Sequence, residues 1–305
     1  MTATTSKNTI AVTVSTPLAP FSGSEGSYML PHHAQEIERL RRQHHFMNLT
    51  TGGQLVVVPS IHSQASLRVL DSGAADGFWL NDLTRQPPSH DSELYSVDIG
   101  SALFPPSPSG SSGAINLSSH DIRAPFPPSW NWASTFDIVH QRLLIWGIKA
   151  SEWPQVISNL VAILKPGGYI QLVEAEWIDP RDPADAVKRP QLRKHAALQE
   201  WSTASFGMDI HIAYKLGSLL KEAGLEDVSK IQFDHGYEDK KNNSAELWVE
   251  CFQNSDEKIP RAGIPGVAAN PKEFHQFLDA LEIEIKTYGY RPKLNFIYGK
   301  KPLAS

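Results

Sequence analysis

An apolar run that ends in an acid and then passes through a short glycine turn is the feature that most constrains the fold of this chain. It spans residues 68–80, where Asp71 stands directly before the turn, Gly73 and Gly77 lie within it, and a helical pattern begins at Phe78. In a doubly wound α/β sheet, this strand–turn–helix order brings glycine backbone and unpaired helix N–H groups against a ligand. We therefore expect a nucleotide-type ligand here, with a purely structural connection as the alternative.

The order of the acid and the glycines narrows the kind of ligand. A dinucleotide site with the pattern G-x-G-x-x-G carries three glycines at fixed positions and an acid near the end of the next strand. Here Asp71 precedes Gly73 and Gly77 in the pattern Asp-x-Gly-x-x-x-Gly, and the third glycine is absent. The arrangement argues against a nicotinamide-dependent oxidoreductase. An NADH fluorescence titration would detect the cofactor binding that such an enzyme requires.

Strand and helix patterns alternate along the first two thirds of the chain. Apolar strands are predicted at Leu67–Leu70, Leu94–Ile99, Ala114–Leu117, Phe136–His140 and Tyr169–Glu174. A helix that Ser151 is expected to cap follows the fourth strand, and a tight turn at Lys165–Gly168 precedes the fifth. This alternation predicts an α/β fold with a mainly parallel sheet covered on both faces.

The last third of the chain has a different organisation. Helices are predicted at 185–204, 244–252 and 271–288, with a further helix capped by Asp209 and a final strand at Leu294–Gly299. A helical insertion before a final strand indicates a cap over the ligand site. The segment 185–290 therefore includes the predicted cap.

The N-terminal part divides into a tail and a lid. Residues 1–27 are rich in Thr, Ser, Gly and Pro and are predicted to form a disordered tail, which leaves 28–305 as one domain. Within 28–60, the spacing of apolar residues predicts an amphipathic helix at Pro31–Met47. We expect this helix to close the site as a lid, with Arg39 and its charged neighbours on a solvated face.

Charge and cysteine content exclude several classes of protein. A net charge of −5 lacks the basic footprint of a nucleic-acid binder, and the apolar stretches are too short to span a bilayer. The single cysteine, Cys251, forms no intramolecular disulfide and favours a reducing compartment, so a cytoplasmic location is expected. No metal site is expected, because the chain has neither CxxC nor HExxH.

Three segments together resemble a known family. Val69–Gly77 resembles the first motif of class I methyltransferases that depend on S-adenosyl-L-methionine (SAM), and Phe136–Leu143 and Leu164–Glu174 resemble later motifs of the same family. The acid-first turn also favours SAM. The resemblance implies a Rossmann-like, doubly wound sheet with an antiparallel last strand, and SAM as the cofactor.

Further features resemble one branch of that family. With Tyr28-x-Leu30-Pro31, the helix around 39–44 and the closing segment Tyr298–Pro302, the chain is similar to the fungal LaeA-like methyltransferases over roughly residues 28–302. That group includes N- and O-methyltransferases of secondary-metabolite clusters and a regulator of such clusters. Ala75 departs from the family pattern Asp-x-Gly-x-Gly-x-Gly at its middle glycine. Its Cβ is expected to fit through a negative φ or a slightly wider turn.

The first three strands each supply candidate cofactor residues. Asp71 is expected to hold the amino group of the methionine moiety, while Gly73 and Gly77 allow the backbone to approach it. Asp98 ends the second strand, 27 positions after Asp71, and is expected to accept hydrogen bonds from both ribose hydroxyls. An acid that only caps a turn is the alternative.

Apolar and acidic neighbours are candidates for the adenine. Ile99, beside the second strand's acid, is expected to pack on the adenine face. Asp121 follows the third strand and is expected to accept from the adenine amino group, with Ile122 as its apolar neighbour.

Residues after the fourth and fifth strands are candidates for catalysis and substrate binding. His140 is the first candidate for a general base or for a contact to the methionine end of the cofactor, although a histidine that fixes a loop is an alternative. His211 is the second candidate base. Glu174 is expected to bind a polar substrate group or to support the site, with Trp177 beside it at the same edge.

An aromatic substrate pocket is expected from later residues. Trp201 and Phe206, with His211, are candidates to line it, and core or lid packing is the alternative. The function predicted from these features is SAM-dependent transfer of a methyl group to an oxygen or nitrogen of a small secondary metabolite. The alternative is a non-catalytic LaeA-like regulator of secondary metabolism that acts through a protein partner.

Overall fold

The computed structural model describes most of the chain. The described residues are 34–59, 66–86, 92–100, 103–104, 115–178, 187–237, 244–253 and 263–303. The predicted tail at 1–27 and the motif at Tyr28–Pro31 lie outside the described residues, as does the first residue of the strand predicted at Ala114–Leu117.

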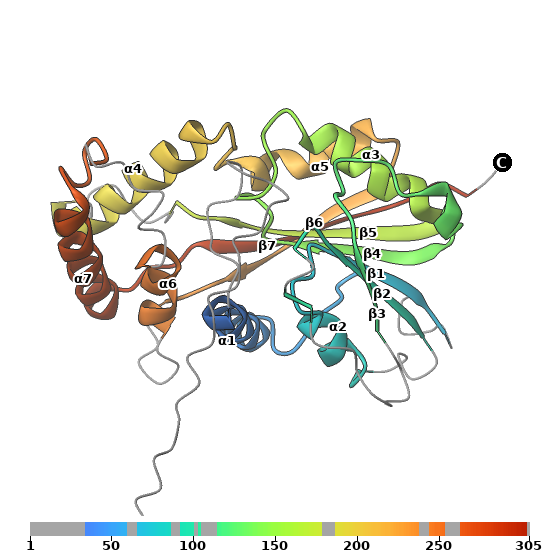
Figure 1. The fold of residues 1–305 in the computed structure, drawn as a ribbon, viewed down its shortest axis with the longest axis horizontal. Helices are drawn as coiled ribbons and strands as arrows, with labels where there is room; N and C mark the ends of the chain where they lie inside the picture. The colour runs from blue at the N-terminus through green and yellow to red at the C-terminus, as the bar shows by residue number, and fades with distance from the viewer. Residues whose placement is uncertain are drawn as a thin grey trace, which may run out of the picture.

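Within the described residues, one sheet of seven strands forms the centre of the molecule, in the order β3-β2-β1-β4-β5-β7-β6 (Figure 1). The strands are β1 (Arg68–Ser72), β2 (Glu93–Asp98), β3 (Asn116–Ser119), β4 (Phe136–Arg142), β5 (Leu164–Glu176), β6 (Glu226–Asp234) and β7 (Lys293–Lys300). Strands β1 to β5 pair in parallel, whereas β7 runs antiparallel to both β5 and β6. The predicted doubly wound, mainly parallel sheet with an antiparallel last strand is confirmed.

Helices cover both faces of the sheet. They are α1 (Ala34–Thr50), α2 (Phe78–Leu83), α3 (Trp153–Ile163), α4 (Pro190–Ser205), α5 (Ile212–Glu222), α6 (Ser244–Gln253) and α7 (Pro271–Tyr288). Figure 1 shows α3 and α5 on one face, with α1 and α2 on the other. Helices α4, α6 and α7 gather at one end of the sheet, where α6 and α7 pack together and α1 packs against α6.

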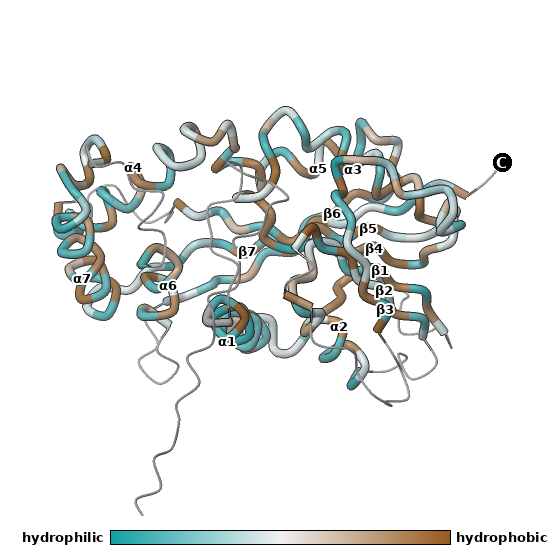
Figure 2. Tube along the Cα trace, viewed as in Figure 1, coloured by the Kyte–Doolittle hydropathy of each residue, from teal (hydrophilic) through white to brown (hydrophobic). Residues whose placement is uncertain are grey.

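Neighbouring apolar residues in the central strands point to opposite faces. In β1, Val69 belongs to the core cluster on one face and Leu70 to the cluster on the other, and Ile138 and Val139 of β4 divide in the same way. All four side chains are fully buried. A continuous apolar run in a central parallel strand is thus explained by helices on both sides, and Figure 2 shows this apolar interior along the sheet.

Strand β5 begins earlier than predicted and includes the predicted turn at Lys165–Gly168. Gly167 keeps a turn-like φ of 80°, but its N–H donates to the Lys301 carbonyl at 2.8 Å and the Lys301 N–H donates to the Gly168 carbonyl at 2.8 Å. The end of the chain therefore pairs with this segment and extends the strand through it. Local turn chemistry does not reveal a partner so far away in sequence.

Two predicted helix caps also differ from the structure. Glu152, and not Ser151, is the N-cap of α3, and its side chain makes no capping bond. Asp209 lies two residues before the N-cap of α5, His211, and accepts from the His211 N–H at 2.9 Å. No helix among the described residues is long and apolar enough to cross a membrane.

Candidate functional site

A cavity lies at the edge of the sheet where the parallel strands end. Its walls come from the β1–α2 turn, the residues that follow β2, β3 and β4, one face of α1, and α6. The carboxyl edge beside the reversal of strand order is where doubly wound sheets bind ligands. Seven of the residues predicted to hold a cofactor or substrate line this cavity: Asp71, Gly73, Asp98, Ile99, Asp121, Ile122 and Trp177.

The β1–α2 turn is held against β2 and closely packed. The N–H groups of Gly73 and Ala74 both donate to the Val97 carbonyl, at 2.9 and 3.2 Å. Gly73 has a φ of 70°, and a Cβ there would lie 2.7 Å from a methyl carbon of Leu144. Gly77, with a φ of 77°, is the N-cap of α2. Both glycines therefore occupy positions where a side chain would strain or crowd the turn.

Ala75 adopts a left-handed backbone conformation, with a φ of 51°. The expectation that a negative φ accommodates this alanine is therefore wrong. The Ala75 N–H donates to Oδ2 of Asp98 at 2.8 Å, which ties the turn to the end of β2. The residue keeps the geometry that glycine adopts more readily and bears the steric cost of its Cβ.

Both oxygens of Asp98 are held by backbone. Oδ2 accepts from Ala75, and Oδ1 accepts from the Gly100 N–H at 2.8 Å. An ionised carboxylate offers about four acceptor positions. Asp98 is therefore fixed in orientation while acceptor positions remain for a pair of hydroxyl donors.

Asp121 is bound by a neighbouring arginine. Arg123 donates from Nε to Oδ1 and from Nη2 to Oδ2, each at 2.8 Å. Partial burial raises the pKa of Asp121, but the hydrogen bonds and charge of Arg123 outweigh this and lower it below the usual value. Ile122 is buried beside it, and its carbonyl accepts from Nδ2 of Asn159 at 2.9 Å. The third-strand end is a rigid, apolar and acidic corner of the cavity.

Asp71 is a buried acid in the cavity wall. Burial raises its pKa to about 8, and the charge of Arg142 opposes that rise. The Asp71 carboxyl is therefore protonated at neutral pH when no ligand is bound. A cationic group placed beside it would favour the ionised form.

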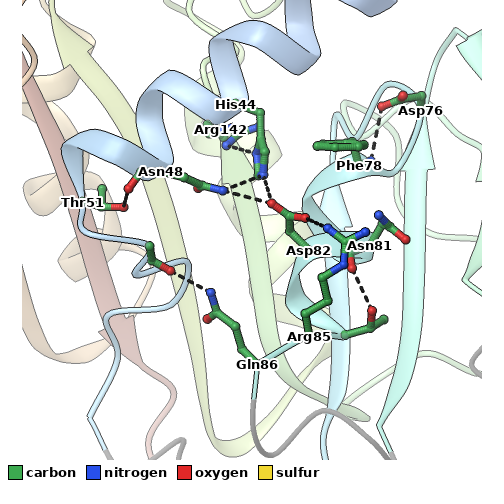
Figure 3. A network of polar contacts seen from close by, with 12 residues as sticks. His44, Asn48, Thr51, Asp76, Phe78, Asn81, Asp82, Arg85, Gln86 and Arg142 are labelled. Atoms are coloured by element: carbon green, nitrogen blue, oxygen red, sulfur yellow. Dashed lines mark hydrogen bonds and ion pairs between the residues drawn. The ribbon is translucent and has the colours of Figure 1, made fainter. Parts of the chain in front are cut away.

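Arg142 belongs to a polar network that fastens α1 over the site (Figure 3). Its Nη1 donates to Nδ1 of His44 at 3.0 Å, and Nε2 of His44 lies 2.8 Å from Oδ2 of Asp82 in α2. Asn48 donates to the same Asp82 oxygen at 3.0 Å. Burial and the charge of Arg142 lower the pKa of His44 to about 4, so the ring is neutral and donates from Nε2.

His140 is buried behind the cavity wall and does not line the cavity. Its side chain is 1% exposed, its ring stacks on Trp79 at 3.9 Å between centroids, and Nδ1 lies 3.1 Å from Nε2 of Gln171. Burial lowers its pKa well below the usual value. His140 does not line the cavity, so its position favours packing between β4 and α2 over proton transfer to a ligand.

Glu174 supports the cavity wall from behind. It is 1% exposed, and its Oε1 accepts from the Leu144 N–H at 2.7 Å. Burial raises its pKa to about 8. Glu174 does not itself line the cavity, whereas the loop that it holds contributes Leu143 and Leu144 to it.

Three further candidates lie apart from this cavity. His211 is an exposed N-cap of α5, and Trp201 and Phe206 lie in and after α4. None of the three lines the cavity. Trp201 and Phe206 are partly buried, which is compatible with the packing role given as the alternative, whereas His211 is exposed. Among the described residues, no cluster of three His, Cys, Asp or Glu side chains could hold a metal ion.

The end of the cavity between α1 and α6 is aromatic. Trp177 and Trp248 stack at 4.8 Å between centroids, with Phe252 beside Trp248. Nε1 of Trp248 donates to Nε2 of buried His195 at 3.0 Å, which fixes the indole. Trp248 and Phe252 were missed from the sequence because α6 reaches the site only through tertiary packing. Their signal is an apolar helix face, which every packed helix has.

Comparison with known proteins agrees with this geometry. A family model described as a methyltransferase domain matches residues 23–230. The N-methyltransferase sirN of Leptosphaeria maculans is 30% identical over 289 residues, which are 91% of this chain and 96% of sirN. The N-methyltransferase gliN of Aspergillus fumigatus is 28% identical over 294 residues, 92% of this chain and 98% of gliN.

A regulator is also similar, over a shorter stretch. The secondary metabolism regulator laeA of Fusarium oxysporum f. sp. lycopersici is 29% identical over 194 residues, which are 62% of this chain and 55% of laeA. The methyltransferase family model covers more than half of the chain. The chain therefore belongs to the methyltransferase-domain family, and S-adenosyl-L-methionine is its cofactor.

Proposed function

We propose that this protein transfers the methyl group of SAM to a nitrogen of a small secondary metabolite bound at the aromatic end of the cavity. The observation that carries the proposal is continuity: one cavity joins the acid–glycine turn after β1 to Trp177, Trp248 and Phe252. A donor and an acceptor bound in the same cavity meet without crossing solvent. The sirN and gliN relatives, matched over nearly their whole length, support nitrogen as the acceptor.

The cofactor is proposed to lie along the carboxyl edge. Asp71 receives the amino group of the methionine moiety, and Gly73 and Gly77 let the turn approach it. Asp98, held by two backbone N–H groups, accepts from the ribose hydroxyls. The corner that follows β2 and β3 takes the adenine, with contacts from Ile99, Asp121 and Ile122.

When bound, SAM supplies a methyl group on a cationic sulfur, so the chain has to position the nucleophile and exclude water. Well-oriented groups gain up to about 7–11 kcal/mol of barrier from such positioning. The buried wall of the aromatic end provides both orientation and water exclusion. Neither His140 nor His211 lines the cavity, and we include neither in the proposed machinery.

A LaeA-like regulator is the second candidate. The similarity to laeA supports it, but that similarity covers 55% of laeA, against 96% for sirN. Turnover separates the two functions: the purified chain alone releases S-adenosylhomocysteine with a metabolite acceptor if it is an enzyme, and only binds SAM if it acts through a protein partner. A cytoplasmic location belongs to the proposal, and cell fractionation tests it.

The cofactor assignment is tested by calorimetry with SAM on the wild type and on Asp98→Ala. Loss of a carboxylate that accepts two hydroxyl bonds is expected to weaken SAM binding at least about tenfold, because each bond to a charged group contributes about 1.5–3 kcal/mol. Asp234→Ala is the matched control. This exposed acid pairs with Lys293 and ends β6, the edge strand at the other end of the sheet from β2. Equal affinity in Asp98→Ala and the wild type would remove the ribose assignment.

A further inference from the structure

A buried ion pair faces the aromatic end of the cavity. Glu36 and Arg39, one turn apart in α1, both line it, and they are 2% and 1% exposed. Arg39 donates from Nε to Oε2 of Glu36 at 2.8 Å and from Nη2 to Oε1 at 2.6 Å. The prediction that Arg39 lies on a solvated face is therefore wrong, and the two charges are held in the protein interior.

Attachment of α1 to α6 does not require a buried pair. Arg39 also donates from Nη1 to Sγ of Cys251 in α6 at 3.1 Å. The same two helices are joined by an exposed pair, Arg42 with Glu250, three residues further along α1. Desolvating two charges costs several kcal/mol per ion, and a buried pair is weak evidence of stabilisation. A pair that is buried beside a cavity therefore calls for an explanation from what the cavity holds.

Glu36 is the carboxylate available at this end. Among the described lining residues of α1 and α6, it is the only acid. The other acids that line the cavity, Asp71, Asp76, Asp98 and Asp121, come from the β1–α2 turn and from the ends of β1, β2 and β3. Each Glu36 oxygen accepts one bond from Arg39, so the carboxylate retains acceptor positions.

We propose that Glu36, oriented by Arg39, accepts the hydrogen bond of the N–H on the nitrogen that is methylated. This inference rests on the proposed function and names its substrate class: a flat, uncharged N–H compound such as an aromatic lactam or an indole. Arg39 already balances the charge of Glu36, so the site favours a neutral N–H over an ammonium ion. Trp177, Trp248 and Phe252 provide apolar surface for a flat ring.

The assignment also separates substrate from product. On methyl transfer the S–CH3 bond breaks as the N–CH3 bond forms, and the N–H proton passes to Glu36, so a neutral N-methyl product lies beside a neutral carboxyl. The proton then leaves to solvent, because the charge of Arg39 favours the carboxylate. The product has no N–H to donate to the restored carboxylate and therefore binds more weakly than the substrate.

The test compares matched N–H and N-methyl probes on the protein saturated with S-adenosylhomocysteine. Calorimetry is run with carbostyril against N-methylcarbostyril and with indole against N-methylindole. The wild type is expected to bind the N–H members at least about tenfold more tightly, the equivalent of one charge-assisted hydrogen bond. No preference, or no binding of either N–H probe, overturns the inference.

The decisive variant replaces both members of the pair with apolar residues. In Glu36→Leu combined with Arg39→Met, the N–H preference is expected to fall to within about twofold, because hydrophobic replacement of a whole buried pair preserves folding. Glu250→Leu combined with Arg42→Met removes the exposed pair between the same helices and is expected to keep the preference. An unchanged preference in the first double variant overturns the inference.

A second variant provides the test if the double variant does not fold. Glu36→Gln keeps an oxygen acceptor without the charge and is expected to lower the N–H preference about threefold or more, since bonds to charged groups are roughly twice as strong. A preference equal to that of the wild type would count against Glu36. The two proposals fail differently: absence of cofactor binding to the wild type removes the proposed function, whereas cofactor binding without N–H preference removes only the role of Glu36.

Discussion

Ala75 holds the β1–α2 turn in a conformation that suits glycine better. Its φ of 51° is in the left-handed region, where a Cβ costs an L-residue about 1–2 kcal/mol. Ala75→Gly relieves that cost but adds the larger unfolded-state entropy of glycine, so we expect a net gain of about 0.5–1 kcal/mol in the free energy of unfolding. Urea unfolding measures the change.

The neighbouring alanine is the control for this substitution. Ala74 is buried and does not have a positive φ, so Ala74→Gly is expected to destabilise the protein by about 0.5–1 kcal/mol. Destabilisation by both substitutions to a similar extent would contradict the strain assigned to Ala75.

The proposed contact between Asp71 and the amino group of SAM predicts that cofactor binding is coupled to proton release. Burial raises the pKa of Asp71 to about 8, so the free protein carries a neutral carboxyl at pH 7. A bound amino group favours the carboxylate, and binding therefore releases a proton. The affinity for SAM is expected to rise as the pH increases from 6 to 8. Calorimetry in two buffers with different ionisation enthalpies counts the released protons.

Replacing the Asp71 carboxyl with an amide removes the titrating group. Asp71→Asn is expected to bind SAM more weakly and to show no proton release at pH 7. A variant that still releases as many protons as the wild type would place the titrating group elsewhere in the site.

At the scale of elements, the loop after β4 depends on the end of β5. Glu174 holds the Leu144 N–H at 2.7 Å, and Leu144 in turn packs against Gly73 in the cofactor turn. Since burial raises the pKa of Glu174 to about 8, its stabilising contribution is complete below about pH 4.5 and is lost as the pH rises through 8.

Glu174→Gln tests this arrangement. The amide oxygen keeps the bond to Leu144 without a titrating proton, so the fall in unfolding free energy between pH 5 and 8 should become shallower by roughly 1 kcal/mol per pH unit. Urea unfolding across this pH range provides the measurement. Asp71 has the same direction of shift and continues to titrate, so some pH dependence is expected to remain. Parallel curves for variant and wild type would show that Glu174 is ionised in the folded protein.

Helix α1 illustrates what an element's own sequence predicts. Its apolar spacing predicted a helix at Pro31–Met47, and the structure has α1 at Ala34–Thr50. The amphipathic pattern did not predict which charged residues are buried. His44 meets Arg142 across 98 positions, and Arg39 meets Cys251 across 212. Such contacts are set by how α1 docks, which no local pattern encodes.

At the scale of the whole molecule, features that repeat along the chain were predictable from the sequence. Contacts between residues far apart in the sequence were not. The alternation of strands and helices predicted the sheet because buried parallel strands need helices on both faces. Asp71, Gly73 and Asp98 line one cavity, as the sequence predicted, because the carboxyl ends of parallel strands meet at one edge of the sheet. His140 was placed at that edge by the same argument, but its side chain points into the space between β4 and α2, where Trp79 stacks on it.

The continuous cavity has a thermodynamic consequence. A ligand that occupies the carboxyl-edge half becomes part of the wall that the second ligand meets in the aromatic half. Linkage then requires reciprocity: whatever factor bound cofactor contributes to substrate affinity, bound substrate contributes equally to cofactor affinity. Substrate affinities measured on the cofactor-free chain therefore describe a different surface from the one on which the methyl group moves.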